Sequence, residues 1–292
     1  MLPMVMYGLI LLARLQSYRN MANFINKICG VTSTGIASVQ GSDAWNKINS
    51  VMDNRYSVDF DGTNDYVDAS TAADNLNVNT GSMCVWIKID ASNNNETPFQ
   101  VSVGTSGNNK LIFNYITNTS WKAQYKGNTG GSVVITTAAY AQSTSDCIAA
   151  GWQHFCMTWD NGTDDEVKIY RNGSLEATGS GLTHFNGTPD RIHVGKAANA
   201  NNTYHDGHID NFALWTSVLT AAEITAIYNV RNPDFTAAFT DTAGNTYDSH
   251  GDLIQWLRML ENTGTNLADS SGNSNTGTLV NFTGGWAADP AF

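Results

Sequence analysis

From Tyr56 onward, apolar and polar residues alternate in short runs that are separated by turn residues. The clearest run is SMCVWIKID, residues 82–90. Its odd-numbered side chains share one face of a strand: Met83, Val85, Ile87 and Ile89. Residues with a period of two are typical of β-strands, so this run predicts a strand that buries one face completely.

Later runs follow the same pattern. NKLIFNYI (109–116) and SWKAQYKG (120–127) predict a hairpin, in which Trp121, Ala123 and Tyr125 alternate with Lys122, Gln124 and Lys126. GWQHFCMTWDNG (151–162) and EVKIYRNGSLEATG (166–179) predict further strands, and Asn172-Gly173 favours a tight hairpin turn. Without any alternation of strands and helices, the pattern predicts an antiparallel β-sandwich.

One helix is expected in this region. Thr220 and Glu223 have the spacing of a capping box, in which each side chain bonds the backbone amide of the other residue. Ile224, Ile227 and Tyr228 then form an apolar stripe, and Asn232-Pro233 ends the helix. We expect this short helix to cap one open end of the sandwich.

Five stretches resemble, in order, the laminin-G-like, concanavalin A-like domains that are related to pentraxins. They are VDFDGTNDYVD (58–68), GSMCVWIKID (81–90), GWQHFCMTWDNG, VKIYRNGSLEATG (167–179) and GHIDNFALWTSVLTAAEITAIYN (207–229). The resemblance covers Tyr56 to Asn229 and implies an all-β, concanavalin A-like jelly-roll sandwich.

The C-terminal stretch WLRMLENTGTNLADSSGNSNTGTLVN (256–281) is similar to the segment that precedes the FDG strand in this family. Here it comes last, as in a circularly permuted chain. We therefore predict an N-terminal extension (1–55), a laminin-G-like sandwich (56–231) and a C-terminal segment (232–292) that completes the sandwich. The alternative is a truncated second repeat that finds its partner strand in another subunit.

The N-terminal run MLPMVMYGLILLARLQ is too short to span a bilayer, and it lacks the basic start of a secretory signal. A docking helix, extra sequence upstream of a start at Met21 and an apolar plug that anchors the protein to an assembly remain open. None of the four cysteines, Cys29, Cys84, Cys147 and Cys156, belongs to a CxxC motif. We therefore expect buried free thiols, with a Cys147–Cys156 disulfide as the alternative.

Charge limits the partners. Only 14% of the 292 residues are charged, the net charge is −11, and the basic residues Arg14, Arg19 and Lys27 are spread out. Such a chain repels a phosphate backbone, so nucleic acid is not an expected partner.

Nothing in the sequence favours catalysis. The chain lacks the paired acids of an E-x-D-x-x-E arrangement and has no G-x-S-x-G motif. Glu223 is used as a helix cap, and His154 and Cys156 fit a packed strand. We therefore predict that the protein is not an enzyme.

Calcium is the expected metal, because relatives of the resembling family often hold it near the FDG turn and the closing strand. The matching residues here are Asp61, Asp65 and Asp210. An Asx turn at Asp61 and cross-strand pairing at Asp210 are the structural alternatives. His205 and His208 could ligate zinc, but no third ligand is evident.

Sugar recognition requires aromatic faces and amide or carboxylate groups. The candidates are Asn114, Trp121, Gln124, Tyr204 and His205. Trp86, Trp152, Trp159 and Trp215 lie in strongly apolar runs and are expected in the core.

The resemblance extends to laminin-G-like proteins of marine bacteriophages. It implies a virion surface or appendage protein whose sandwich binds glycans or host-surface polysaccharide, with other virion proteins and further copies of the chain as partners in a homo-oligomer. A purely structural role without glycan binding, and a secreted protein in place of a virion protein, are the alternatives.

Overall fold

The computed structural model describes residues 56–90, 96–105, 107–116, 120–128, 132–136, 148–197, 203–283 and 285–291. The chain divides into two compact units, Met1–Asp53 and Asn54–Phe292. Residues 1–55, with the predicted docking segment, and the cysteines Cys29 and Cys147 lie outside the described residues. All of the described residues belong to the second unit.

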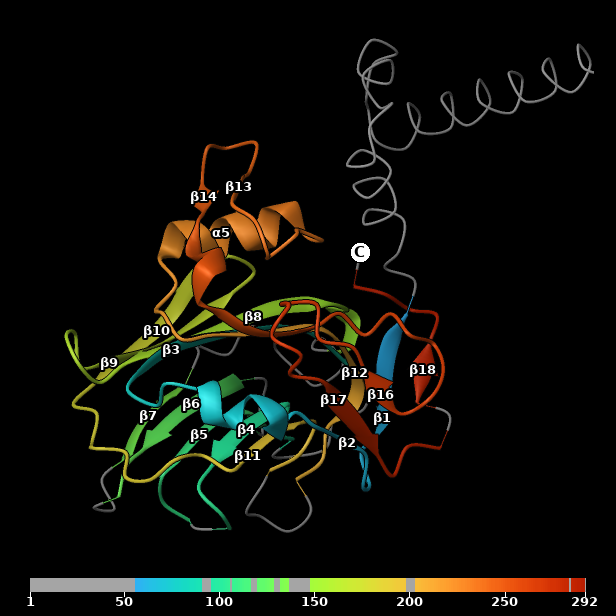
Figure 1. Cartoon of the computed structure of the whole chain (residues 1–292), viewed down its shortest axis with the longest axis horizontal. Helices are drawn as coiled ribbons and strands as arrows, with labels where there is room; N and C mark the ends of the chain where they lie inside the picture. Colours follow the sequence, from blue (N-terminus) through green and yellow to red (C-terminus); the bar gives the residue numbers. More distant parts are fainter. Residues whose placement is uncertain are drawn as a thin grey trace, which may run out of the picture. The chain divides into compact units, whose positions relative to one another are not determined.

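Two antiparallel sheets face each other in this unit (Figure 1). The strands of the first sheet are β1 (Ser57–Asp61), β3 (Thr80–Ile89), β8 (Gln153–Asp160), β9 (Glu166–Arg171), β10 (Ser174–Ser180), β12 (Asp206–Trp215), β15 (Leu253–Leu257) and β18 (Trp286–Ala287). They run in the order β10-β9-β8-β3-β12-β1-β18, and β15 also pairs with β12.

The second sheet contains β2 (Tyr66–Asp68), β4 (Phe99–Ser102), β5 (Lys110–Ile116), β6 (Ser120–Lys126), β7 (Ser132–Thr136), β11 (Arg191–Val194), β16 (Asn266–Leu267) and β17 (Gly277–Val280). Its order is β16-β17-β2-β11-β4-β5-β6-β7. The remaining elements are α5 (Ala221–Val230), the hairpin β13 (Phe239–Thr240) with β14 (Thr246–Tyr247), and the 3-10 turns η1 (Ser70–Asn75) and η2 (Ser249–Asp252). The predicted all-β sandwich is confirmed.

Inward-pointing side chains of both sheets form one core between them. The odd-numbered residues of β3 are buried there, as their alternation predicts. From the second sheet, Trp121 stacks on Phe113 with ring centroids 5.0 Å apart. β5 and β6 form the predicted hairpin, with Lys110 opposite Lys126.

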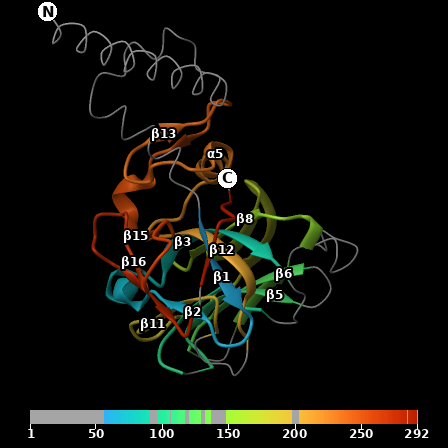
Figure 2. The ribbon, with the colours of Figure 1, turned by 90° about the vertical axis from the view of Figure 1, so that its right-hand side faces the viewer.

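A second apolar cluster lies on the outer face of the first sheet. Cys84, Cys156 and Trp215 point away from the main core and pack against Ile224 and Ile227 of α5. Thr220 and Glu223 form the predicted capping box. Figures 1 and 2 show α5 on the side of the first sheet that faces away from the second. The expectation that α5 caps an open end is therefore wrong, because the outward apolar residues of β3, β8 and β12 require a cover.

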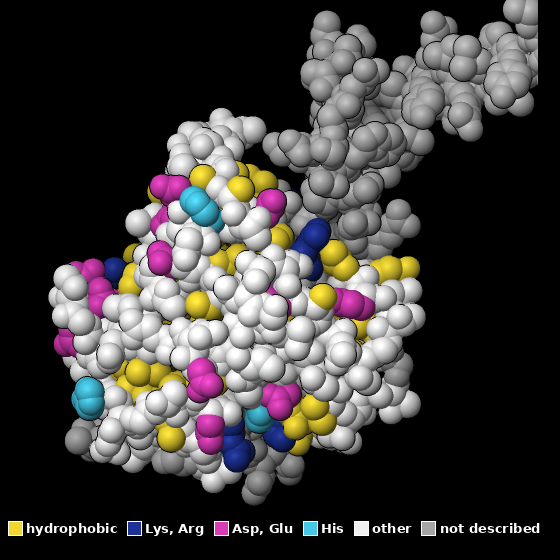
Figure 3. All heavy atoms as spheres, in the orientation of Figure 1, with side chains coloured by type: hydrophobic (Ala, Val, Ile, Leu, Met, Phe, Trp, Pro, Cys, Tyr) yellow, Lys and Arg dark blue, Asp and Glu magenta, His cyan; other side chains and the backbone are white. Residues whose placement is uncertain are grey.

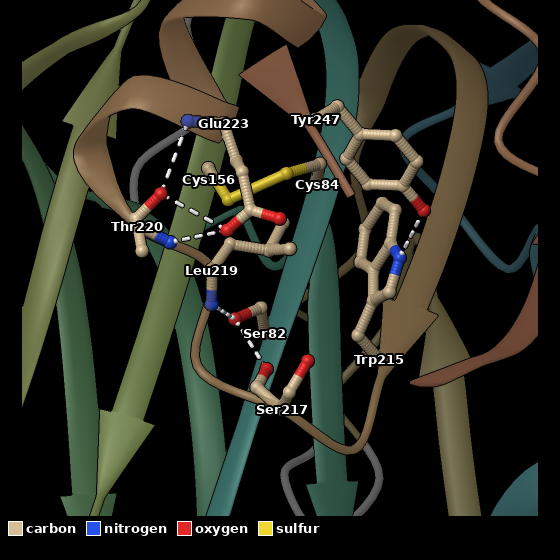
Figure 4. The surroundings of a disulfide bond; sticks show 9 residues. All are labelled: Ser82, Cys84, Cys156, Trp215, Ser217, Leu219, Thr220, Glu223 and Tyr247. Carbon is tan, nitrogen blue, oxygen red and sulfur yellow. Dashed lines mark hydrogen bonds between the residues drawn. A yellow bond between two sulfur atoms is a disulfide. The ribbon is translucent and has the colours of Figure 1, made fainter. Parts of the chain in front are cut away.

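A disulfide joins Cys84 and Cys156 beneath α5 (Figure 4). The two residues are directly opposite each other in the β3–β8 ladder, with Cα atoms 4.2 Å apart. Both predictions for Cys156, a free thiol and a bond to Cys147, are wrong. The pairing depends on strand register across 72 residues of sequence, which local pattern does not determine.

The C-terminal strands join both sheets. β15 pairs with the second half of β12, while β1 pairs with the first half of the same edge. β18 pairs with β1, and β17 pairs with β2. The described C-terminal strands thus find partners within their own chain. The permuted family order and the exact domain boundaries stay predictions.

Asp269 organises the polar stretch between β15 and β17. Its carboxylate accepts hydrogen bonds from the backbone amides of Trp256 (2.8 Å), Ser271 (2.9 Å) and Asn275 (2.8 Å). The amide of buried Gln255 donates to the carbonyl oxygens of Ala69 (3.3 Å) and Asn275 (2.7 Å). Of these bonds, the one from Gln255 to Ala69 connects the C-terminal segment to residues 56–231, and the others hold the segment itself together. Among the described helices, none is long and apolar enough to cross a membrane.

The Asp269 bonds give a stability prediction. We expect Asp269→Ala to lower the free energy of unfolding by about 2–4 kcal/mol, because it leaves several backbone amides without an acceptor. Asp234→Ala removes an exposed turn carboxylate that accepts bonds from Thr236, and we expect a loss below about 1 kcal/mol. Chemical denaturation of both variants measures the difference. Equal, small losses would show that the Asp269 bonds do not stabilise the C-terminal segment.

His154 gives a prediction about pH. It is 1% exposed and packs beside Trp86 and Tyr228, with ring centroids 5.1 and 6.2 Å away. Burial lowers its pKa from 6.5 to about 3. The unfolded chain therefore binds the extra proton first, and the stability that neutral His154 contributes above pH 6.5 is lost as the pH falls below that value.

We expect the unfolding free energy of the wild type to decrease as the pH falls from 6.5 to about 4, and His154→Gln to flatten this slope. His184→Gln, at an exposed histidine, should leave the slope unchanged. Denaturation at several pH values tests this. Parallel slopes for the wild type and His154→Gln would contradict the assignment.

Candidate functional site

Four carboxylates gather where the chain passes from β1 in the first sheet to β2 in the second: Asp61, Asp65, Glu96 and Asp206, hereafter the acidic cluster. Asp61 is opposite Asp206 in the β1–β12 ladder. The carboxylate of Asp65 accepts a bond from the Asp61 amide (3.3 Å), and Glu96 accepts one from the Asp206 amide (3.2 Å).

Gly62 makes this convergence feasible. It adopts a φ of +70°, and a Cβ at this position would lie only 2.9 Å from the side chain of Asp206. The carboxylate of Asp61 also accepts bonds from the amides of Thr63 (2.8 Å) and Asn64 (3.2 Å), which is the Asx turn that the sequence offers as an alternative. Asp61 therefore forms the Asx turn and also lies close to Asp206.

Burial and like charge make it energetically unfavourable to hold the ionised carboxylates of the acidic cluster together. Asp65 is 4% exposed, and among the described residues its Oδ1 has no hydrogen-bond partner. Burial, followed by the charge of Asp61, raises the pKa of Asp65. Burial and the charge of Glu96 raise the pKa of Asp206. A cation near these carboxylates would offset both effects, and calcium prefers such oxygen ligands, but their ligand atoms do not converge within 4.8 Å as those of Asp59, Asp90 and His208 do.

Asp210, the third residue of the predicted calcium set, lies elsewhere. It is opposite Trp86 of β3, and its Oδ2 accepts a bond from the amide of Ala291 (3.0 Å). Four strand residues separate it from Asp206, which corresponds to about 13 Å. The structure thus brings Asp61 and Asp65 together, and it adds Glu96 and Asp206 where the sequence suggested Asp210.

A different trio within the described ranges, Asp59, Asp90 and His208, has potential metal-ligand atoms within 4.8 Å of one another. Lys88 lies beside it. Lys88 Nζ lies 3.2 Å from Asp90 and 2.7 Å from Asp289, and His208 Nε2 lies 2.7 Å from Asp90. These contacts describe an ion-pair network better than a metal site. His205 instead contacts Glu96 (2.9 Å), so the suggested zinc pair His205–His208 has no common ligand position.

The outer face of the second sheet is the other polar surface. A row of side chains crosses it from strand to strand in direct register: Asp68, His193, Gln100, Ile112, Gln124 and Val134. Acidic, basic and histidine side chains gather at the lower margin of the molecule in Figure 3, on the side of this sheet.

An aromatic group lies at the β2–β11 end of this face. The rings of Tyr66 and His193 are 4.9 Å apart. Lys196 Nζ lies 4.3 Å from the ring centre of Tyr66 and 5.5 Å from that of Tyr204. Both tyrosines are half-buried, and His193 Nδ1 has no partner among the described residues. Burial lowers the pKa of His193 to about 4, so its ring is neutral at pH 7.

The predicted sugar-binding residues divide between several places. Gln124 lies on the outer face, and Tyr204 belongs to the aromatic group. Asn114 is also on this face but is 7% exposed, and its amide donates to Thr97 (2.6 Å). Trp121 is 1% exposed in the core and His205 is completely buried beside Glu96, so neither offers a stacking surface.

Tyr66, His193 and Lys196 were not predicted from the sequence as site residues. The alternation in YVD and RIHV does place Tyr66 and His193 on the polar side of their strands. Only the pairing of β2 with β11 brings the two rings together, and no local signal predicts that pairing.

Comparisons with known proteins agree with this architecture. A family model described as the concanavalin A-like lectin/glucanases superfamily matches residues 61–225. A search of curated proteins found no match.

Among solved structures, a candidate carbohydrate-binding protein from Bacteroides ovatus is 14% identical with a TM-score of 0.52, and the match covers 80% of this chain and 60% of that one. The CBM40 of the Ruminococcus gnavus IT-sialidase, bound to α2,3-sialyllactose, is 15% identical with a TM-score of 0.48, covering 59% of this chain and 96% of that one. A heptameric SAP-like pentraxin from Limulus polyphemus is 14% identical with a TM-score of 0.46, covering 60% and 82%.

At 14% identity, the likeness to the Bacteroides ovatus protein speaks for the fold alone. The family match extends over more than half of the 292 residues and includes strands of both sheets and the start of α5. The chain belongs to the concanavalin A-like lectin/glucanase superfamily.

Proposed function

We propose that this protein is a non-enzymatic, lectin-like protein that binds glycans on the outer face of its second sheet. The observation that carries the proposal is the aromatic group of Tyr66, His193, Lys196 and Tyr204, at one end of the outward row that also contains Asp68 and Gln124. The apolar side of a pyranose ring packs on an aromatic face, and its hydroxyls require hydrogen-bonding groups nearby.

This face combines both kinds of group. Tyr66 and Tyr204 provide half-exposed rings, and Lys196 stacks on both. Asp68 and Gln124 add acceptors and donors in register with His193. The neutral imidazole of His193 can accept or donate through Nδ1, depending on its tautomer.

We further propose that the acidic cluster binds calcium. Asp61, Asp65, Glu96 and Asp206 would supply the oxygen ligands, and the unpartnered Oδ1 of buried Asp65 fits a bound cation. Asp65 immediately precedes Tyr66. Calcium would therefore neutralise the cluster and fix the start of β2, where the glycan-binding face begins.

We also propose a place outside the cell, on a virion surface as a decoration or fibre, with a secreted protein as the alternative. The Cys84–Cys156 disulfide supports either location, because such bonds persist in oxidising surroundings. In this proposal, residues 1–55 dock the sandwich onto other virion proteins, and several copies assemble into a homo-oligomer. A rigid structural block without glycan binding is the competing function.

The first prediction for this function concerns Tyr66. We expect Tyr66→Ala to weaken glycan binding by about tenfold or more, since a stacked ring contributes on the order of 1–3 kcal/mol. Trp152→Ala is the control, because Trp152 is a half-buried aromatic residue bonded to Asp289, next to the Lys88 ion-pair network of the first sheet. Glycan arrays followed by titration measure both variants. Loss of binding only in Trp152→Ala would move the site to the other face, and no binding by the wild type would favour the structural role.

The second concerns calcium. We expect calcium to raise the unfolding temperature of the wild type and EDTA to lower it, by several degrees for about 1–2 kcal/mol of binding free energy. In EDTA, Asp65→Asn should be more stable than the wild type, because it removes a buried charge beside Asp61. It should also lose the calcium response, whereas Asp90→Asn should retain it. A response that survives in Asp65→Asn would place calcium elsewhere.

A further inference from the structure

Three lysines lie together on the outer face of the second sheet. Lys122 and Lys126 alternate with the core residues Trp121, Ala123 and Tyr125 along β6, so their side chains share the outer face. Lys110 of β5 is directly opposite Lys126. Strand geometry places the Cβ atoms of such a pair about 5 Å apart. Lys122 lies four residues along β6, or about 13 Å, from Lys126.

The described strands around these lysines carry no carboxylate. The sequences of β4 to β7 are FQVS, KLIFNYI, SWKAQYK and SVVIT, which contain neither Asp nor Glu. Within the described part of the chain, the salt bridges of lysine and arginine involve Lys88, Lys168, Arg171 and Arg191 and none of these three lysines. In a protein with a net charge of −11, this is a local excess of positive charge.

Holding these cations together is unfavourable for the free protein. All three are half-buried. Burial, then the charges of Lys126 and Lys122, lowers the pKa of Lys110, and burial lowers that of Lys122. An anionic group bound over the lysines would remove the repulsion and regain charge-assisted hydrogen bonds.

We propose that the glycan bound by this face is an anionic polysaccharide, whose carboxylate or sulfate groups pair with Lys110, Lys122 and Lys126. The inference rests on the proposed glycan-binding function and adds the chemical class of the ligand. The separation of the Lys110–Lys126 pair from Lys122 fits repeated anionic groups along a polymer better than one small anion. The aromatic group lies at the other end of the same face, but Ile112 (5% exposed) and Gln100 (0% exposed) between the two are buried, so we assign the anionic groups to the lysines alone.

The test compares two variants that each remove two positive charges. Lys110→Gln/Lys122→Gln removes lysines of this face. Lys168→Gln/Arg231→Gln removes Lys168 of β9 in the first sheet, which pairs with Glu166, and the exposed Arg231 at the end of α5. The probes are dextran sulfate, polygalacturonate and uncharged dextran, with a general glycan array as the search for neutral ligands. Thermal unfolding shows that each variant is folded.

We expect the full-length protein to bind at least one of the two polyanions, more weakly as salt increases, and not to bind dextran. The Lys110/Lys122 variant should bind about tenfold or more weakly, whereas the Lys168/Arg231 variant should match the wild type. Dextran sulfate and polygalacturonate distinguish sulfate from carboxylate as the recognised group.

Two results would overturn the inference and separate it from the proposed function. If the protein binds neutral glycans and the Lys110/Lys122 variant binds them equally well, the lectin function stands and the anionic ligand is rejected. Binding of no polysaccharide of any kind would reject both. Equal losses in the two double variants, or equally tight binding of single-stranded DNA, would show a general charge effect and also contradict the proposal.

Discussion

The architecture depends on the burial of both faces of the central strand β3. Its odd-numbered side chains pack against the second sheet, while Cys84 and Trp86 point the other way. A two-layer sandwich leaves its outer faces in water, so residues such as Trp86 would remain exposed without a third layer. The segment after β12 provides that layer: α5 brings Tyr228 onto the ring of Trp86, at a centroid distance of 5.8 Å.

The same constraint explains why the two outer faces differ. The outer face of the first sheet is covered, and the Cys84–Cys156 bond lies beneath that cover (Figure 4). No described helix packs in the same way on the outer face of the second sheet. Its outward positions on β5 and β6 include the half-buried polar residues Lys110, Lys122, Gln124 and Lys126 beside the apolar residue Ile112. This more polar face is therefore the one that we propose for a ligand.

Features that neighbouring residues determine could be predicted from the sequence. Features that depend on contacts between distant segments of the chain could not. Alternation identified the faces of β3 and β6, and the spacing of Thr220 and Glu223 located the helix, because these signals are local. The disulfide and the acidic cluster depend on strand register, which joins Cys84 to Cys156 and Asp61 to Asp206 across long stretches of chain. Trp121 is a different case. In SWKAQYK it has the opposite parity to Gln124, so the local pattern already excluded both from one sugar-binding surface.

Charge is separated between two regions of the molecule, and one short segment connects them. Carboxylates meet at the end of β1, and β5 and β6 carry lysines that form no salt bridge with another described residue. Residues 61–68 begin in the acidic cluster at Asp61 and Asp65 and end on the outer face at Tyr66 and Asp68. Because Asp65 and Tyr66 are adjacent, any cation that changes the position of the Asp65 carboxylate also acts on the backbone that carries the Tyr66 ring. The proposed calcium site and the proposed glycan site are therefore joined by a single peptide bond, through which a metal at the first would order the second.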